Sequence, residues 1–178
     1  MRTLRIITIA LAALAIGAVI TALSMSSHWQ VEASEQINVP PAKIFPLINT
    51  LSQWPEWTVW NKSSHPNLIM TYEGQPAGKG AIQIWQEGNS KSRLEIVDSE
   101  TDRLVAYRLK MGSALFLTHG EIRLKPTARG TQVSWKVYGD TGPNLIARLM
   151  MLVFKPMIKN DLVGGLSNLK AKLQKPST

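Results

Sequence analysis

The chain has 178 residues, no cysteine and a formal net charge of +8. Its length suits one domain with a buried core, and its composition of 44% hydrophobic and 18% charged residues excludes an intrinsically disordered chain. The lack of cysteine excludes disulfides, thiolate nucleophiles and cysteine-ligated metal sites.

The positive charge is concentrated toward the C-terminus. Residues 29–141 carry 12 basic and 11 acidic residues, hence +1, whereas residues 142–178 carry six basic residues against Asp161 alone, hence +5. The basic segment lies far along the chain from the tryptophan-rich stretch at residues 54–60. Surfaces that bind nucleic acid place basic and stacking side chains together, so we expect no nucleic-acid partner.

The sequence of the N-terminal segment predicts a membrane anchor. Residues 6–23 contain no charge, and as a helix they would span about 27 Å, close to the thickness of a bilayer core. Arg2 and Arg5 precede them and no Lys or Arg follows until Lys43, which favours a cytoplasmic N-terminus. We expect residues 1–28 to form a transmembrane anchor and residues 29–178 a domain on the extracytoplasmic side. A cleaved signal peptide is the alternative, but the apolar run is longer than is usual there.

Two short helices are predicted after an opening strand at residues 29–39. A Pro-Pro pair at residues 40–41 begins the first, at residues 41–51, since proline is harmless in a first turn. Pro46 is expected to kink or shorten it. The second helix carries three tryptophans at a spacing of three, which places their indoles on one face: Trp54, Trp57 and Trp60.

Six strands and a C-terminal helix are predicted next. Turn residues separate alternating segments at residues 65–74, 79–88, 92–99, 103–111, 114–125 and 131–140, a spacing typical of a meandering antiparallel sheet with one buried face. Leucines and an isoleucine recur at helical spacing from residue 158 to residue 173 and mark the inner stripe of a long helix. Pro156 is expected to divide that region into two helical pieces.

This element order resembles the SRPBCC superfamily, which includes START lipid-transfer domains and the birch-pollen-allergen fold, and most closely its polyketide cyclase/dehydrase-like branch. The resemblance covers residues 29–175. It is carried by INVPPAKIFPLI, WPEWTVWN, the glycine turn at residues 78–80 that leads to Trp85, and DLVGGLSNLKAKL. It implies an α+β helix-grip fold, in which an antiparallel sheet curls around a long C-terminal helix and encloses an apolar cavity.

The resemblance places the tryptophan segment beside the mouth of that cavity. Aromatic side chains with one polar group suit an entrance that is apolar inside and wet outside. The candidate ligand-binding residues, in the cavity or at its mouth, are Trp54, Trp57, Trp60, Tyr72, Trp85, Tyr107 and Trp135. The alternative is that these aromatic residues only seal the core between helix and sheet.

The sequence shows no catalytic constellation. None of the three histidines has partners at metal-ligand spacing, and there is no Gly-x-Ser-x-Gly elbow or phosphate-binding glycine loop. His119 and Glu121 could form an acid/base pair, but strand alternation places them on the outer face, opposite Ile122. Tyr72 and Glu73 either line a cavity mouth or end a strand. We expect no catalytic residue, no metal and no cofactor.

Three functions remain open. The favoured one is a membrane-tethered module that binds a hydrophobic small molecule or lipid, with the membrane itself as a second partner. The alternative is a polyketide cyclase/dehydrase-like enzyme acting on an aromatic or polyketide-like substrate, which needs a titratable group with a perturbed pKa in the cavity. The third is a structural or regulatory partner of an envelope protein, with the tryptophans as an exposed patch.

Overall fold

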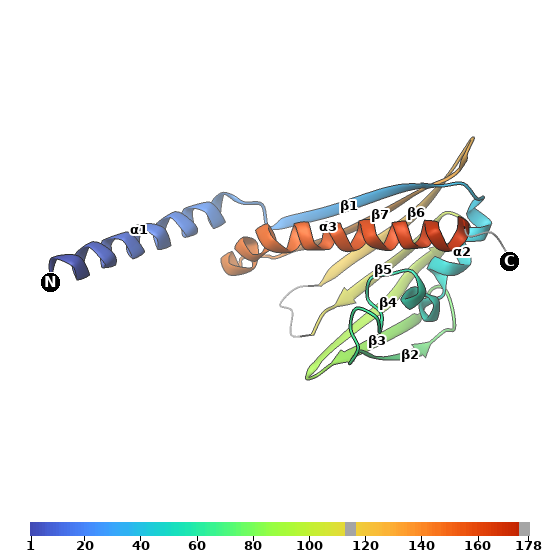
Figure 1. Ribbon diagram of the computed structural model, residues 1–178, viewed down its shortest axis with the longest axis horizontal. Helices are drawn as coiled ribbons and strands as arrows, with labels where there is room; N and C mark the ends of the chain where they lie inside the picture. The colour runs from blue at the N-terminus through green and yellow to red at the C-terminus, as the bar shows by residue number, and fades with distance from the viewer. Residues whose placement is uncertain (113–116, 175–178) are drawn as a thin grey trace.

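The computed structural model describes residues 1–112 and 117–174. It begins with one long helix, α1 (Arg2–Ser24), which projects away from the rest of the molecule (Figure 1). This helix has 23 residues, a mean hydropathy of 2.6 and almost no buried surface. Its length and composition are those of a membrane-spanning helix or of a signal sequence. The other elements form the helix-grip body.

Seven strands form one antiparallel sheet in the order β1-β7-β6-β5-β4-β3-β2. Neighbours along the chain pair as hairpins from β2 to β7, and β1 closes the edge against β7. The strands are β1 (His28–Ile37), β2 (Ile69–Gly74), β3 (Ala81–Glu87), β4 (Ser90–Glu100), β5 (Leu104–Lys110), β6 (Thr118–Thr127) and β7 (Gly130–Asp140). The predicted meander is thereby confirmed; the start of its fifth member, at residues 114–116, lies outside the described residues.

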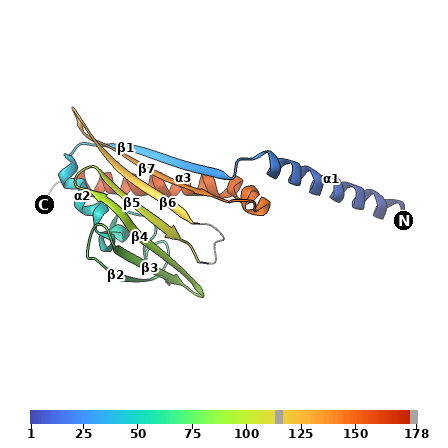
Figure 2. The same cartoon turned by 180° about the vertical axis from the view of Figure 1, so that it is seen from behind.

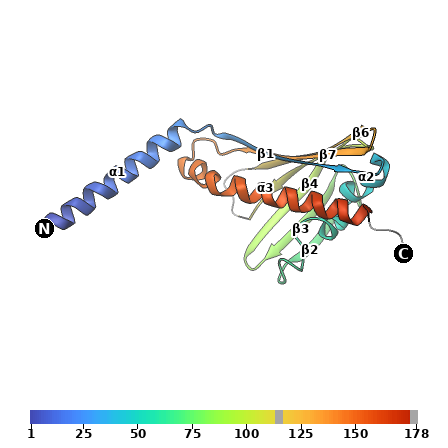
Figure 3. The ribbon, with the colours of Figure 1, turned by 45° about the horizontal axis from the view of Figure 1, so that its top comes forward.

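The helices of the body lie on the concave side of the sheet and at one of its ends. α3 (Leu145–Gln174) runs along β1 (Figure 3), while α2 (Pro41–Asn49) and the short 3-10 helix η1 (Leu51–Glu56) gather at the end farthest from α1 (Figures 1 and 2). This is the α+β helix-grip arrangement that the sequence predicted.

Strand alternation identifies the buried face correctly. Along β7 every second residue is buried, including Val133, Trp135 and Val137. His119 stacks on Tyr138, and Glu121 binds the Arg123 guanidinium at 2.7 Å. Their buried neighbour Ile122 faces the core, so His119 and Glu121 lie on the outer face, as expected.

Two predictions of local helix geometry are wrong. α3 continues through Pro156 as one helix, because tertiary contacts hold it on both sides of the proline: before it, Arg148 donates to the Met25 carbonyl at 3.2 Å, and after it, Lys170 pairs with Glu35 at 2.6 Å. A long helix supported by a sheet can tolerate the hydrogen bond that proline removes.

The second correction concerns the tryptophan segment. It forms a 3-10 helix that ends at Glu56, so Trp60 lies beyond the helix. The ring of Trp57 packs on Trp54, with centroids 5.3 Å apart, whereas the ring of Trp60 stacks on His65. The three indoles therefore do not share one helical face.

Candidate ligand-binding site

Four of the seven candidate aromatic residues pack on one another in the core. Trp54 lies against Tyr107 and Trp135 with edge-to-face geometry and ring centroids 5.4 and 5.9 Å apart. Trp57 lies 5.3 Å from Trp135. We call Trp54, Trp57, Tyr107 and Trp135 the aromatic cluster. All four are buried, so this cluster fills the space between η1, α3 and the sheet.

Each polar group of the aromatic cluster has a hydrogen-bond partner. Trp135 Nε1 donates to the Tyr107 hydroxyl at 2.9 Å, and Trp54 Nε1 donates to the Ile48 carbonyl at 3.0 Å. Trp57 Nε1 donates to a carbonyl of α2 at 3.2 Å. Burial raises the pKa of Tyr107 well above its ordinary value, against a smaller opposing effect of its bond with Trp135. A satisfied polar network of this kind fixes a core in one arrangement.

Two other candidates, Trp60 and Trp85, face open space. They border a cleft of about 270 Å³ at the end of the β3–β4 hairpin, which we call the indole cleft. Their rings are roughly parallel, with centroids 6.3 Å apart and an interplanar angle of 29°. The remaining residues lining the cleft are Glu87, Ser90, Ser92, Met111 and Gly112.

Ionisable groups surround Trp60. The His65 imidazole stacks on its ring at 4.6 Å, nearly parallel, and His65 Nδ1 lies 3.3 Å from Glu87 Oε2. The Asp161 carboxylate of α3 is hydrogen-bonded to Trp60. Burial raises the pKa of Asp161, while the bond from Trp60 and the nearby His65 act in the opposite direction.

Sequence reasoning did not assign His65, Glu87 or Asp161 to a site. The available signal was that Asp161 is the sole acidic residue after Asp140 in a basic, helical segment. His65 lies in the loop before β2, and Glu87, 22 residues later, ends β3, so no spacing rule links them; the pairing of β2 with β3 brings that loop beside the end of β3.

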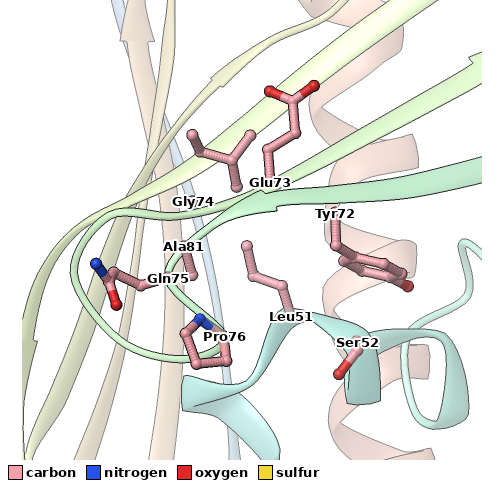
Figure 4. Close-up of a pocket in the computed structure, with 9 residues that line it drawn as sticks. Leu51, Ser52, Tyr72, Glu73, Gly74, Gln75, Pro76 and Ala81 are labelled. Atoms are coloured by element: carbon pink, nitrogen blue, oxygen red, sulfur yellow. The ribbon is translucent and has the colours of Figure 1, made fainter.

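The seventh candidate, Tyr72, lies in a separate and larger cleft of about 320 Å³ (Figure 4). Residues of η1, the end of β2 and the β2–β3 turn line it. The Glu73 carboxylate points away from Leu51 and Ser52 in Figure 4, and it pairs with Arg93 at 3.6 Å. Burial raises the pKa of Tyr72, opposed by its hydrogen bond with Gln83. Two indoles and the Glu87 carboxylate border the indole cleft, and His65 and Asp161 contact the side chains of that lining, so the indole cleft is the better candidate for a ligand site despite its smaller volume.

Within the part of the chain that the structure describes, no group of three or more His, Asp or Glu side chains is arranged to hold a metal ion. The lining of the indole cleft offers indole faces, serine hydroxyls and the Glu87 carboxylate, which pairs with His65. Such a lining can hold an apolar body by its faces and orient a polar group by hydrogen bonds.

A family model described as "Polyketide cyclase / dehydrase and lipid transport" matches residues 28–174, which include all strands of the sheet, the aromatic cluster and both clefts. The chain belongs to this family. The SRPBCC resemblance that the sequence suggested is therefore correct. No curated protein matches the sequence.

Solved structures show the same fold at low sequence identity. Protein MLL2253 from Mesorhizobium loti has 14% identity and a TM-score of 0.62, covering 84% of this chain and 100% of its own. Ara h 8.0201 has 15% identity and a TM-score of 0.58, over 84% and 99%. DynU16, from the dynemicin biosynthetic locus, has 12% identity and a TM-score of 0.58, over 82% of this chain and 47% of its own. At these identities, the likeness establishes the helix-grip fold alone.

Proposed function

We propose that this family member is a membrane-tethered module that binds a hydrophobic small molecule or lipid in the indole cleft. The observation that carries the proposal is the pair of indoles, Trp60 and Trp85, that face open space while the aromatic cluster fills the core. The description of the family, which includes lipid transport, supports the same ligand class.

The size and lining of the indole cleft define the ligand further. A volume of about 270 Å³ lies just below the usual range for small-molecule pockets, which begins at about 300 Å³. It suits a planar ring system or one end of an acyl chain, lying against the Trp60 and Trp85 faces. The hydroxyls of Ser90 and Ser92 and the Glu87 carboxylate border the same cleft and favour a ligand with one polar end.

The aromatic cluster has a supporting role in this proposal. Its four buried side chains hold η1 against the sheet, and this fixes the segment that leads to Trp60. Of the seven sequence candidates, Trp60 and Trp85 are proposed as ligand contacts and Tyr72 as the wall of the second cleft.

Tethering follows from α1 and its flanking charges. Arg2 and Arg5 lie at its start, and the 18 residues after it contain no Lys or Arg before Lys43; this bias favours a cytoplasmic N-terminus and an extracytoplasmic body. We propose that residues 1–28 are retained as an anchor and that the domain begins at residue 29. An anchor keeps the cleft at high effective concentration beside a bilayer in which apolar ligands dissolve.

Photocrosslinking tests the ligand site directly. The full chain in detergent micelles is irradiated with a diazirine derivative of palmitic acid, and the modified residues are located by mass spectrometry. We expect adducts at Met111 and on the Trp60–Trp85 pair, suppressed by excess palmitic acid. Trp85→Ala should reduce them severalfold, whereas Tyr72→Ala, in the other cleft, should not. Adducts confined to α1, or equal labelling of both variants, would refute the site.

Cysteine accessibility tests the membrane orientation, because the chain has no cysteine of its own. A single Arg129→Cys variant, at the exposed β6–β7 turn, should react with a membrane-impermeant maleimide on intact spheroplasts. A Thr3→Cys variant should react only after lysis. The reverse pattern contradicts the orientation, and release of the chain by carbonate contradicts the anchor.

One observation favours the enzyme as a second candidate function. The His65–Glu87 pair and Asp161 lie next to the indole cleft, and burial raises the pKa of Asp161. Such groups can transfer protons to or from a bound substrate. The assay incubates the full chain with a linear aromatic polyketide analogue and follows loss of one water by mass spectrometry. Turnover that His65→Gln abolishes, without loss of binding, would favour the enzyme; unchanged substrate would exclude this reaction.

A further inference from the structure

The first half of α3 exposes an unusual amount of apolar surface. Between residues 145 and 157 nearly every side chain is apolar, and six large ones are exposed. Ile146, Val153 and Leu152 are 71%, 64% and 57% exposed. The others are Met150, Phe154 and Met157. A contiguous apolar surface of this kind on a helix normally marks a contact with a partner or a membrane.

The exposed apolar residues of α3 lie on a helix face whose later part is covered by the tryptophan segment. Ile146, Met150, Val153 and Met157 follow one another at intervals of four, three and four, so they share one face. The same spacing leads on to Asp161, which binds Trp60, and to Gly164, whose Cβ position lies 3.0 Å from Val59. The tryptophan segment thus covers the later part of this face and leaves the earlier part uncovered.

The exposure is not confined to that one face. Leu152 projects about 100° away from Val153 around the helix axis, yet both are more than half exposed. A ligand or groove covers one side of a helix, whereas a helix that is apolar around most of its circumference suits an apolar medium. The pattern therefore favours a lipid environment over a bound small molecule.

The start of α3 is fixed beside the end of α1. The Arg148 guanidinium donates to the carbonyls of Met25 and Ala22 at 3.2 and 3.4 Å, and to the Gly142 carbonyl at 2.8 Å. Thr141 also donates from its backbone N–H to the Ser27 carbonyl at 3.0 Å. These bonds hold the start of α3 beside the end of α1, as Figures 1 and 3 show. The apolar turns of α3 therefore begin where α1 would leave a bilayer.

Charge along the same segment matches an anionic surface. Between residues 142 and 160 the chain carries Arg148, Lys155 and Lys159 and no acidic residue. A basic side chain near an anionic leaflet contributes about 1 kcal/mol of attraction, so headgroups would add to the apolar contact.

We infer that residues 145–157 of α3 lie in the interfacial layer of the same bilayer that α1 spans. This rests on the anchor part of the proposed function. Met111 and Leu117, which follow β5 and precede β6, are also exposed, and the end of β5 and the start of β6 lie toward the α1 side of the body (Figures 1 and 2). Because Met111 lines the indole cleft, the cleft would open toward lipid, and a ligand could enter from the bilayer without crossing water.

Depth-dependent quenching tests the inference with the full chain. Single-cysteine variants carrying the fluorophore NBD are reconstituted in vesicles of phosphatidylcholine and phosphatidylglycerol, with or without doxyl-labelled lipid. We expect the Val153→Cys label to be blue-shifted and quenched by shallow doxyl groups. The Thr127→Cys label, at the exposed last residue of β6, should remain unquenched, because the β6–β7 hairpin ends on the side of the body farthest from α1 (Figure 1).

A label at Ala13, inside α1, separates the two levels of the proposal. Quenching at Ala13→Cys but not at Val153→Cys would overturn the membrane contact of α3 and leave the anchor intact. Quenching at neither position would overturn both. A blue shift at Val153 without doxyl quenching would show that protein, such as a second copy of the chain, covers this surface, and would also overturn the inference.

A charge substitution gives an independent readout. With the label at Ile146→Cys, adding Met150→Asp should lower doxyl quenching about twofold or more, because a carboxylate resists transfer into the interface. The matched control, Ser167→Asp, adds the same charge at an exposed polar position of α3 and should leave the quenching unchanged. Equal quenching in both variants would overturn the proposed contact.

Discussion

At the residue scale, six of the seven candidate aromatic residues divide between two kinds of environment. Trp54, Trp57, Tyr107 and Trp135 are buried and form a closed polar and aromatic network, whereas Trp60 and Trp85 border open space. The same residue type therefore supplies both the rigid core and the proposed binding surface. The bond between Trp135 and Tyr107 is the point at which the core network is most easily tested.

Replacing Tyr107 by Phe removes the acceptor of the Trp135 indole N–H. The donor then stays buried without a partner, which we expect to lower the free energy of unfolding by about 1–3 kcal/mol. Urea unfolding of the full chain in detergent micelles, followed by tryptophan fluorescence, measures the loss. Tyr72→Phe is the control, because Tyr72 is 45% exposed and its substitution should change stability by less than about 0.5 kcal/mol. Equal effects would contradict the assigned role.

The raised pKa of Tyr107 predicts a loss of stability at alkaline pH. Above about pH 10 an unfolded tyrosine loses its proton, whereas buried Tyr107 keeps its own, so the unfolded state binds fewer protons. The free energy of unfolding then falls as pH rises, by up to about 1.4 kcal/mol per pH unit for this group. The stability advantage of the native chain over Tyr107→Phe should therefore shrink above about pH 10. A constant difference would contradict the prediction.

The sequence could predict that side chains of the aromatic cluster lie on the inner face of the sheet, but it could not predict which residues they contact there. Strand alternation identifies Tyr107 and Trp135 as inward-facing, and it does so equally for a filled and for a hollow interior. The prediction that Trp60 shares a helical face with Trp54 and Trp57 failed because the 3-10 helix ends at Glu56. The partners His65, Glu87 and Asp161 come from three separate segments, and only the folded sheet and α3 bring them to Trp60.

At the element scale, α3 shows how tertiary contacts override local signals. Pro156 and the Gly164–Gly165 pair both weaken a helix in isolation, yet α3 is continuous from Leu145 to Gln174. Packing against β1 and the Lys170–Glu35 pair support it. Gly165 also has a steric role, because an added Cβ would lie 2.9 Å from Cζ3 of Trp135 and 3.7 Å from Trp57.

Gly165→Ala is therefore expected to destabilise the protein although alanine is the better helix former. The propensity gain is about 1 kcal/mol, and forcing a methyl group against the closed aromatic cluster costs about 1–3 kcal/mol. Gly164→Ala is the matched control: its Cβ would meet one methyl group of half-buried Val59 at 3.0 Å, which has room to move, so stability should be unchanged or slightly higher. Urea unfolding of both variants measures the difference, and a more stable Gly165→Ala variant would contradict close packing here.

At the scale of the whole molecule, the fold and its order of elements could be predicted, because helix and strand periodicities and turn residues are local properties of the sequence. The distribution of open space could not, because it depends on how α3, η1 and the curved sheet fit together. Arg148 contributes to the position of the body relative to α1, because its guanidinium binds the Ala22 carbonyl of α1 and the Gly142 carbonyl of the body. Nothing in the local pattern around Arg148 distinguishes it from a solvent-exposed base.

Arg148→Ala should loosen the body on its anchor while leaving each part folded. Residues 25–27 form a short connection, and without the guanidinium the Ala22 and Met25 carbonyls lose their shared donor. Spin labels at Ala18→Cys and Thr127→Cys, in the full chain in vesicles, report the distance distribution between α1 and the body. We expect it to broaden in Arg148→Ala and to broaden partly in Arg148→Lys, because an ammonium lacks the planar fork of donors. Lys159→Ala removes a charge from α3 without touching the junction and should keep the native width. Equal widths in all variants would show that the connection itself, rather than Arg148, sets the orientation at which the indole cleft meets the membrane.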